Sequence, residues 1–199
     1  MKRWAFLLLL LTIMLVITAC GGNADDESNS QDNMGGADDN TQNEKKDDDN
    51  QTVQVDLKNG DGESVGTTTL EQVSKGVKIT LEGHDIPSGT HGFHIHETGQ
   101  CEAPDFKSAG GHFNPEDSNH GFDDPDGPHA GDLPNIVVGK DGTVNESFIA
   151  EKVTLEEGKD NSLFGDGGTA IVIHEGADDG KSQPSGDAGD RFACGAINK

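Results

Sequence analysis

Apolar and polar residues alternate along much of the chain after Gln51. The segments TVQVDLK, VGTTTLEQ and GVKITLEG carry an apolar residue at about every second position, and short breaks rich in glycine, asparagine and lysine separate them. This pattern predicts antiparallel strands with one buried face. Further strand segments are THGFHIHE, NIVVGKDGTVNESFIA, SLFGDGGTAIVIH and RFACGAI. With about eight short strands and no helical periodicity over three turns, residues 51–199 are expected to form an all-β, eight-stranded Greek-key sandwich or barrel.

The first nineteen residues have a different pattern, in which two basic residues precede a largely apolar run. This order predicts a secretory signal peptide over residues 1–19. The run ends in Ile17-Thr18-Ala19-Cys20, followed by two glycines, and resembles a bacterial lipobox. The alternative is an uncleaved membrane anchor, but the apolar run is short for a spanning helix. We therefore expect Cys20 to be lipidated and to attach the protein to the outer face of the bacterial cell membrane.

Residues 20–50 are expected to form a disordered acidic tether behind that cysteine. The segment holds ten acidic residues against Lys45 and Lys46 and has almost no large apolar side chains. Such a segment cannot bury enough surface to offset the entropy of ordering. Calcium binding by its aspartates is the alternative, although charge blocks of this kind are usually solvated.

The charge of the chain limits which classes of partner it can bind, and its cysteines indicate the cellular compartment. The chain has 37 acidic against 14 basic residues and a formal charge of −23. Such a surface repels nucleic acid and anionic lipid, so we expect no nucleic-acid partner and membrane contact through the lipid alone. Setting Cys20 aside, Cys101 and Cys194 remain as one candidate disulfide, which would indicate an oxidising, extracytoplasmic compartment.

Histidine is concentrated in one stretch of the chain. Six of the eight histidines lie between His91 and Asp132. His94 and His96 are two residues apart in a predicted strand and therefore point to the same face, where both can reach one ion. A long loop with few regular elements follows, and such loops are uncommon in compact domains unless something holds them. It contains His112, His120, His129 and Asp132. Three imidazoles and a carboxylate suit tetrahedral zinc.

Six ordered segments carry a resemblance to a known family. They are GFHIHE, SAGGHFNP, HG, HAGDLPNI, IVIHEGADD and GDRFACGAI, within about Val53 to Ile197. Together they resemble the copper/zinc superoxide dismutase family, whose zinc loop also has the ligand spacings of eight, nine and three residues found here. The resemblance supports the pairing of Cys101 with Cys194, which in the family joins the metal loop to the final strand.

The resemblance implies one copper ion and one zinc ion per subunit. The implied copper ligands are His94, His96, His112 and His174, and the implied zinc ligands are His112, His120, His129 and Asp132. Imidazole nitrogens suit both Cu(II) and Zn(II). His112 belongs to both sets, and a ring that ligates two cations must lose both protons, which two adjacent positive charges favour. His112 is therefore expected to be a bridging imidazolate and to pass a proton to peroxide when its bond to copper breaks.

Three other residues, Arg191, Asp178 and His91, receive roles from the same resemblance. Arg191 would dock and orient superoxide, with Lys181 as a second cation of the rim loop; the alternative for Arg191 is a surface ion pair, for example with Asp190. Asp178 would accept hydrogen bonds from the outward nitrogens of His94 and His120, or else be a solvated acid. His91 would brace the backbone. His84 is interpreted as a surface residue.

The predicted function is dismutation of superoxide to oxygen and hydrogen peroxide by a copper redox cycle with a structural zinc. The alternative is a non-enzymatic copper/zinc-binding protein of the same fold. Family members of that kind usually lack one or more copper ligands, whereas all eight ligand positions and Arg191 are present here. A purely structural sandwich would not explain the clustered histidines. The sequence leaves open whether the protein is a monomer or a homodimer.

Overall fold

The computed structural model describes residues 51–199 as an all-β unit, which confirms the predicted fold class. The signal peptide, Cys20 and the acidic tether lie outside the described residues. The strands are β1 (Thr52–Asn59), β2 (Ser64–Val73), β3 (Gly76–Gly83), β4 (Gly89–His91), β5 (Phe93–His96), β6 (Ile136–Val138), β7 (Val144–Ala150), β8 (Thr169–His174) and β9 (Arg191–Ile197), with a single 3₁₀ turn, η1 (Lys107–Ala109). Within this part of the chain, no helix is long and apolar enough to cross a membrane.

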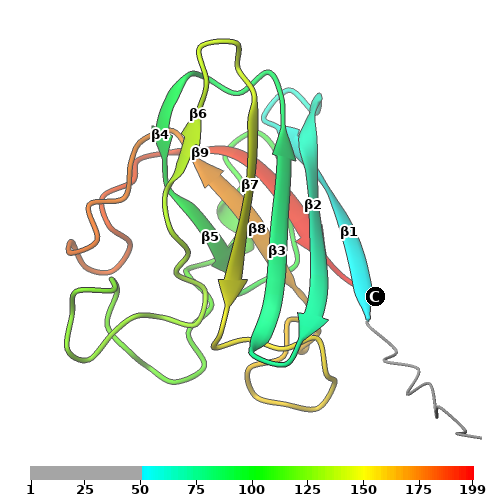
Figure 1. Ribbon diagram of the computed structural model, residues 1–199, viewed down its shortest axis with the longest axis vertical. Helices are drawn as coiled ribbons and strands as arrows, with labels where there is room; N and C mark the ends of the chain where they lie inside the picture. Colours follow the sequence, from blue (N-terminus) through cyan, green and yellow to red (C-terminus); the bar gives the residue numbers. More distant parts are fainter. Residues whose placement is uncertain (1–50) are drawn as a thin grey trace, which may run out of the picture. The chain divides into compact units, whose positions relative to one another are not determined.

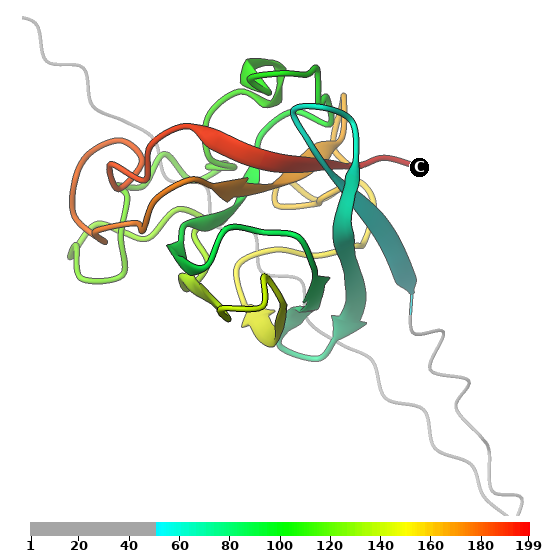
Figure 2. The same ribbon diagram turned by 90° about the horizontal axis from the view of Figure 1, so that it is seen from above.

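The strands form one large curled sheet and one small sheet. The large sheet has seven strands in the order β5-β8-β9-β1-β2-β3-β7, and β4 pairs with β6 in a second sheet. All of these pairs are antiparallel. Figure 1 shows β7, β3 and β2 side by side with β8 and β9 behind them, and Figure 2 shows the curl that gives a half-barrel. The loop between β8 and β9 and much of the loop between β5 and β6 lie on the β5 side of the sheet, whereas the loop between β7 and β8 lies below β2 and β3 (Figure 1).

Nine strands are present where about eight were expected, because the segment THGFHIHE divides at Gly92. β4 lies before this glycine and pairs with β6, whereas β5 lies after it and pairs with β8. At the division the Gly92 N–H donates to the carbonyl of Gly176 at 2.7 Å, and its carbonyl accepts from the N–H of His174 at 2.9 Å. A Cβ at this position would lie 2.9 Å from that of Ala188. Glycine thus lets the chain pass from one sheet to the other while the loop between β8 and β9 (the rim loop, residues 175–190) packs against it.

The strands nearest the histidines are buried on both faces. β1 alternates between buried and more exposed residues, as a strand of a half-solvated sheet should. In β5 and β8 every residue is buried. Ile171 and Ile173 of β8 join the main core, whereas Ala170 and Val172 pack with Phe106, Ala109 and Cys194 in a second cluster. The loop that carries Phe106 therefore covers the outer face of β8, the face on which the histidines lie.

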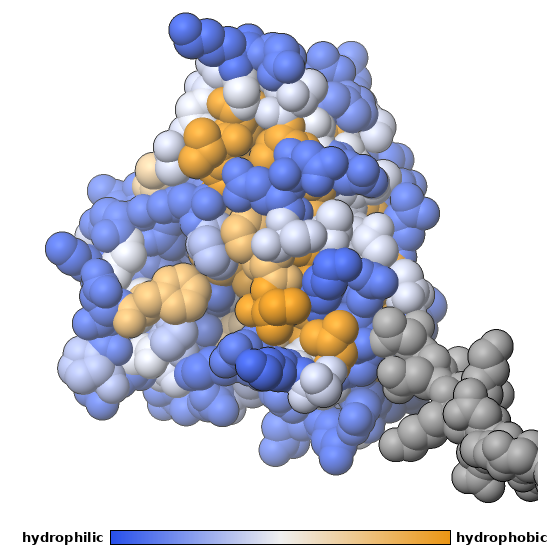
Figure 3. Space-filling view, viewed as in Figure 1, coloured by the Kyte–Doolittle hydropathy of each residue, from blue (hydrophilic) through white to orange (hydrophobic). Residues whose placement is uncertain are grey.

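The face that carries β6 and β7 is mixed in polarity. Its large exposed apolar side chains are Val137 and Ile149, and Phe122 of the neighbouring loop is also exposed. Figure 3 shows apolar side chains in separate groups on this face, with polar side chains between them. Scattered apolar groups of this kind are normal on soluble proteins and do not define a docking surface.

Candidate metal centre

Strands β5 and β8 place three histidines on the outer face of the sheet. His94 lies opposite Val172 and His96 opposite Ala170, while Phe93 and Ile95 point into the main core. His174 ends β8, and its Nε2 lies 3.4 Å from Nε2 of His96. All three rings are buried. The two-residue spacing in β5 therefore brings both imidazoles to one face, as the pattern predicted.

The metal loop is attached to the free edge of β5 at two points. His112 forms an isolated bridge with His96, and Asp132 forms one with His94. Between these bridges, both backbone groups of Ile95 pair with the loop. Its carbonyl accepts a hydrogen bond from the N–H of Phe113, and its N–H donates to the carbonyl of Gly131, both at 2.8 Å. This pairing brings both ends of the ligand-bearing loop against the strand that carries the first two histidines.

Gly131 makes that attachment sterically feasible. A Cβ at this position would collide with the carbonyl oxygen of Ile95 and approach the N–H nitrogen of Phe113 to 2.9 Å. Any larger residue would push the loop away from β5 and carry Asp132 with it. The glycine in HAGD is therefore required for close approach of two backbones.

The first ligand group consists of His94, His96, His112 and His174, whose candidate ligand nitrogens all lie within 4.8 Å of one another. In three of these rings, the nitrogen that points away from the group has a hydrogen-bond partner. Nε2 of His94 lies 2.7 Å from a carboxylate oxygen of Asp178. Nδ1 of His96 lies 3.0 Å from the carbonyl of Gly110, and Nδ1 of His174 lies 3.2 Å from the carbonyl of Gly189. In contrast, Nδ1 of His94 and Nε2 of His112 are buried without any hydrogen-bond partner. Buried polar atoms are almost always satisfied, so these two fit metal ligation.

The second ligand group surrounds one carboxylate. Oδ1 of Asp132 lies 2.8 Å from Nδ1 of His112, 3.1 Å from Nδ1 of His120 and 3.2 Å from Nδ1 of His129. Its other oxygen accepts hydrogen bonds from the N–H groups of Gly121 and His129, each at 3.0 Å. The four ligand atoms lie within 4.8 Å of one another. Three imidazole nitrogens and one carboxylate are the donor set that suits tetrahedral zinc.

His112 belongs to both groups. Its Nδ1 faces Asp132, while its Nε2 is the unpartnered nitrogen on the side of the other histidines. The ring centroid lies 4.1 Å from that of His94, 5.1 Å from that of His96 and 5.5 Å from that of His129. The ring thus separates two neighbouring metal positions and offers one nitrogen to each.

Burial keeps His94, His96 and His174 of the first group neutral. Desolvation lowers the pKa of His94 to about 4 and that of His174 to about 3, and it holds the pKa of His96 well below its usual range. In His94 the hydrogen bond to Asp178 opposes this shift without cancelling it. Neutral imidazoles have free lone pairs, so these rings can accept a metal without first losing a proton.

The second group behaves differently because of Asp132. Burial alone would lower the pKa of His120, but the adjacent carboxylates of Asp132 and Asp178 outweigh it and raise that pKa to about 9. Nδ1 of His120 lies 3.1 Å from Asp132 without forming a hydrogen bond, which leaves this nitrogen available to a metal. Burial would likewise raise the pKa of Asp132, and the adjacent rings of His112 and His120 hold it well below its usual range instead. Without metal, this group is therefore a buried ion pair between a carboxylate and an imidazolium.

Asp178 connects the two groups through their outer nitrogens. Its two oxygens lie 2.7 Å from Nε2 of His94 and 3.1 Å from Nε2 of His120. Asn135 holds its backbone by two reciprocal hydrogen bonds of 2.8 and 2.9 Å. The N–H of Gly180 adds a third donor to the carboxylate at 2.6 Å. This geometry is not that of a solvated surface acid, the alternative that the sequence left open.

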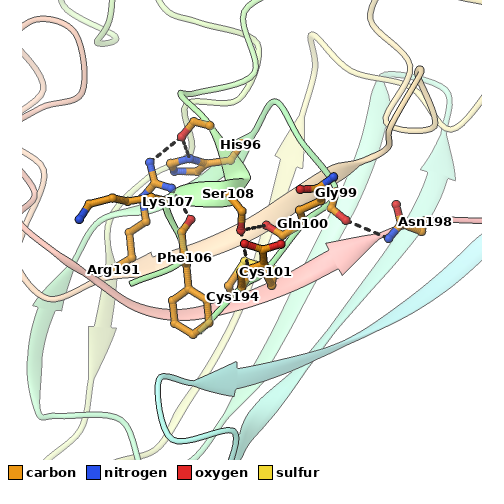
Figure 4. The surroundings of a disulfide bond; sticks show 12 residues. His96, Gly99, Gln100, Cys101, Phe106, Lys107, Ser108, Arg191, Cys194 and Asn198 are labelled. Atoms are coloured by element: carbon orange, nitrogen blue, oxygen red, sulfur yellow. Dashed lines mark hydrogen bonds between the residues drawn. A yellow bond between two sulfur atoms is a disulfide. The ribbon is translucent and has the colours of Figure 1, made fainter. Parts of the chain in front are cut away.

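Arg191 lies beside His96 of the first ligand group. Its guanidinium donates to the carbonyls of Phe106 and Gly110, both at 2.5 Å, and Gly110 also accepts from His96 (Figure 4). Burial lowers the pKa of Arg191. None of the ion pairs among residues 51–199 involves this side chain, which argues against a surface ion pair with Asp190. Arg191 is therefore held in place by backbone carbonyls and keeps its charge uncompensated by a direct partner.

The disulfide confirms the expected pairing of Cys101 with Cys194. It ties the segment that carries Phe106 and Gly110 to β9, the strand that begins with Arg191 (Figure 4). A cavity of about 430 Å³ opens beside this arginine and is also lined by Lys107, whose ammonium pairs with Asp105 at 2.7 Å. The disulfide and the two carbonyls together position the guanidinium.

The remaining predicted residues lie outside both ligand groups. His91 is buried, with Nδ1 2.8 Å from the carbonyl of His174 and Nε2 2.7 Å from that of Pro87. His84 is exposed and lies 2.9 Å from the carboxylate of Asp85. Lys181 is exposed on the rim loop. Sequence reasoning missed Asn135, Gln183 and the carbonyl of Gly110, because amides and backbone groups leave no periodic or charge signal.

A curled antiparallel sheet with two metal-binding groups that share one histidine defines a dinuclear β-sheet metalloprotein. Comparison with known proteins identifies the family: the model of the copper/zinc superoxide dismutase family matches residues 64–197, and the chain belongs to that family. It is 52% identical over 143 residues to superoxide dismutase [Cu-Zn] 1 of Aquifex aeolicus, covering 71% of this chain and 85% of the relative.

Solved structures agree with this assignment. A SOD-like protein from Bacillus subtilis is 42% identical, with a TM-score of 0.70, covering 72% of this chain and 97% of that one. A Cu/Zn superoxide dismutase from Brucella abortus is 28% identical, with a TM-score of 0.60 over 74% of this chain and 99% of that one. These relatives cover between 71% and 74% of this chain.

Proposed function

We propose that this protein is a copper/zinc superoxide dismutase that converts two superoxide anions and two protons into oxygen and hydrogen peroxide. One observation carries the proposal: His112 offers Nδ1 to one buried ligand group and an unpartnered Nε2 to the other. We assign copper to His94, His96, His112 and His174, and zinc to His112, His120, His129 and Asp132. The family relationship supports both assignments.

The chemistry divides between the metals and the chain. Copper held by the first group would supply one-electron redox chemistry toward superoxide, and zinc held by the second group would have a structural role. The residues of the chain hold the ligands and move the proton. Nε2 of His112 is the site at which a proton can be held, because Asp132 and the other zinc ligands fix the opposite side of the ring.

Arg191 binds and orients the substrate. Its guanidinium is fixed by two carbonyls beside His96 and has no acidic partner among the described ion pairs, so it can attract a small anion to that position. Lys181 is the second cation that we assign to steering. The acidic surface leaves few other positive groups to attract superoxide.

A copper- or zinc-binding protein without turnover is the second candidate function. It would explain the ligands, and one relative is called a superoxide dismutase-like protein (Bacillus subtilis, 43% identical over 145 residues). It would not explain Arg191, which ligates nothing in either group. Family members named as Cu-Zn enzymes, at 52% and 50% identity, also favour turnover.

The test is superoxide decay by the protein loaded with copper and zinc. We expect catalysis that disappears when copper is omitted and persists, reduced, when zinc is omitted. A loaded protein that binds both metals and does not accelerate superoxide decay would establish the binding-protein alternative.

We further propose that the enzyme acts outside the cytoplasm. The disulfide between Cys101 and Cys194 supports an oxidising compartment. The sequence supports a signal peptide over residues 1–19, a lipidated Cys20 with an acidic tether to residue 50, and the enzyme domain over 51–199. Cys20→Ser should move the protein from the membrane fraction to the soluble fraction. Unchanged membrane association would refute the lipid anchor.

A further inference from the structure

Gln183 of the rim loop, residues 175–190, reaches across to the metal loop. Its Oε1 accepts a hydrogen bond from the N–H of His120 at 2.8 Å, and its Nε2 donates to the carbonyl of His120 at 2.9 Å. One side chain thereby satisfies both backbone groups of a residue 63 positions earlier. This is the pairing that a neighbouring strand would provide, supplied here by an amide.

His120 depends on this contact more than its neighbours do. It lies outside any strand, and no other hydrogen bond within residues 51–199 uses its backbone N–H or carbonyl. The adjacent N–H of Gly121 has Asp132 as its partner. His120 itself is buried, so losing Gln183 would leave two enclosed backbone groups without partners.

The rim loop does not need Gln183 for its own closure. The N–H of Gly186 donates to the carbonyl of Ser182 at 2.7 Å, and the N–H of Asp179 donates to the carbonyl of Gly186 at 2.8 Å. The side chain of Ser182 also donates to Asp179 at 2.5 Å. Within the loop, Gln183 adds a single longer contact of 3.3 Å to the carbonyl of Lys181. Its main contacts are therefore directed out of the loop.

The rim loop thus holds His120 from two sides. Asp178 contacts Nε2 of the ring at 3.1 Å, and Gln183 holds the backbone. The direction of Nδ1 toward Asp132 depends on both, because a ring is oriented by the position of its backbone and by the partner of its outer nitrogen.

We propose that Gln183 is a positioning residue for zinc, which it retains by fixing the backbone of His120. The inference rests on the zinc assignment above. The copper-side ligands on β5 and β8 do not contact Gln183 through any hydrogen bond, so copper retention should not depend on it.

The experiment measures zinc release from the copper- and zinc-loaded protein to an excess of a chromogenic chelator. Four variants are compared: Gln183→Ala, Gln183→Glu, Ser185→Ala and Gln54→Ala. Ser185 controls for a change in the same loop and Gln54 for loss of an exposed glutamine, and neither side chain makes a hydrogen bond among the described residues. Copper content, the copper electron paramagnetic resonance spectrum and the urea midpoint are recorded alongside.

Gln183→Ala should release zinc about tenfold faster than the wild type, because loss of a partner behind a ligand typically costs 10–100-fold in metal affinity. Gln183→Glu should lie between the two, since it keeps the acceptor for the N–H of His120 and loses the donor to its carbonyl. Both controls should stay within about twofold of the wild type, with copper retained in all variants.

Zinc release from Gln183→Ala at the rate of the controls would overturn the proposal, as would parallel loss of copper and zinc with a lowered urea midpoint. If the wild type itself takes up no zinc, the zinc assignment fails, and that result is distinct from failure of the Gln183 contact.

Discussion

The two ligand groups are built from different kinds of structure. His94, His96 and His174 stand on strands whose backbones are fixed by sheet pairing. His120, His129 and Asp132 lie in a loop without strands of its own, which isolated bridges to β5, side chains and turns hold. Their protonation also differs, since the strand histidines are neutral without metal whereas His120 is paired as an imidazolium.

This difference shows that one fold can place ligands that are already oriented for a metal beside ligands whose charges are balanced internally until a metal binds. The strand group is preorganised, because its rings are buried, oriented and unprotonated before any ion arrives. The loop group replaces an internal ion pair with zinc, and zinc must displace a proton to bind. His112 belongs to both, so the loop group determines how firmly the shared ring is held.

Removing a strand ligand should produce the largest effect. His96→Ala should lower the rate of superoxide decay by more than about 100-fold, because loss of even an outer-shell partner costs 10–100-fold and this change removes a direct ligand. Zinc content should be retained, since His96 is not in the loop group. His84→Ala, at an exposed histidine, is the matched control and should retain full activity. Equal loss of zinc and copper in His96→Ala would show that the two groups are not separable.

The reverse experiment removes the carboxylate of the loop group. Asp132→Asn preserves the shape and loses the charge that Nδ1 of three histidines face, so zinc affinity should fall by more than about 100-fold. Copper should still bind through His94, His96 and His174. Metal analysis after dialysis against a chelator measures both. Retained zinc would contradict the assignment.

Removing the disulfide tests whether the histidines on β5 and β8 depend on the loop that the disulfide anchors. Because it closes a separation of 93 residues, replacing Cys101 and Cys194 together by serine should lower the free energy of unfolding by about 2–5 kcal/mol. The variant should also raise KM for superoxide, since Gly110, whose carbonyl holds both His96 and Arg191, lies in the segment that the disulfide anchors. Urea unfolding and initial rates give the two values. Unchanged stability would show that the loop is held without the cross-link.

Asp178 connects the two groups, and its removal should affect both more weakly. Asp178→Asn should lower copper and zinc affinity by about 10- to 100-fold each, because it weakens the hydrogen bonds to the outer nitrogens of His94 and His120. Asp187→Asn changes an exposed acid of the same loop, for whose side chain no hydrogen bond is found among the described residues, and is the control. An effect confined to one metal would show that Asp178 serves a single group.

Sequence patterns predicted the strands and the ligands for physical reasons. β1, β2 and β3 are half-solvated, so their alternation is visible, and His94 and His96 share a face because strands have period two. β8 lacks alternation because a loop covers its outer face. The assignment of His174 and Arg191, and of His112 as a copper ligand, came from family resemblance, since nothing in the sequence spacing alone brings this loop together with β5, β8 and β9.

Apart from the contacts of Asp178 with His94 and His120, which the resemblance implied, the contacts around the ligands were beyond sequence reasoning. The bridges of His112 and Asp132 to β5 use backbone groups, which every residue has. Gln183 and Asn135 act through amides in loops, where no periodicity distinguishes them from surface residues. The split at Gly92 depends on the packing of Ala188, which is distant in sequence.

A further expected effect concerns the dependence of zinc affinity on pH. Because the pKa of His120 is raised to about 9 in the absence of metal, zinc must displace its proton below that pH. Zinc affinity should therefore rise about tenfold per pH unit from 7 to 9 and level off above. His94 and His174, with pKa values of about 4 and 3, release no proton to copper in this range. Calorimetry in buffers of different ionisation enthalpy measures the protons released. A flat zinc affinity from pH 7 to 9 would contradict the ion pair.

Anomalous diffraction from crystals of the loaded protein, collected at the copper and zinc absorption edges, tests the shared role of His112 most directly. The expected result is a copper peak among Nε2 of His112 and the rings of His94, His96 and His174, with a zinc peak beside Nδ1 of His112 and Asp132. Both peaks at one position, or a His112 ring that touches a single ion, would contradict the bridge between the two sites.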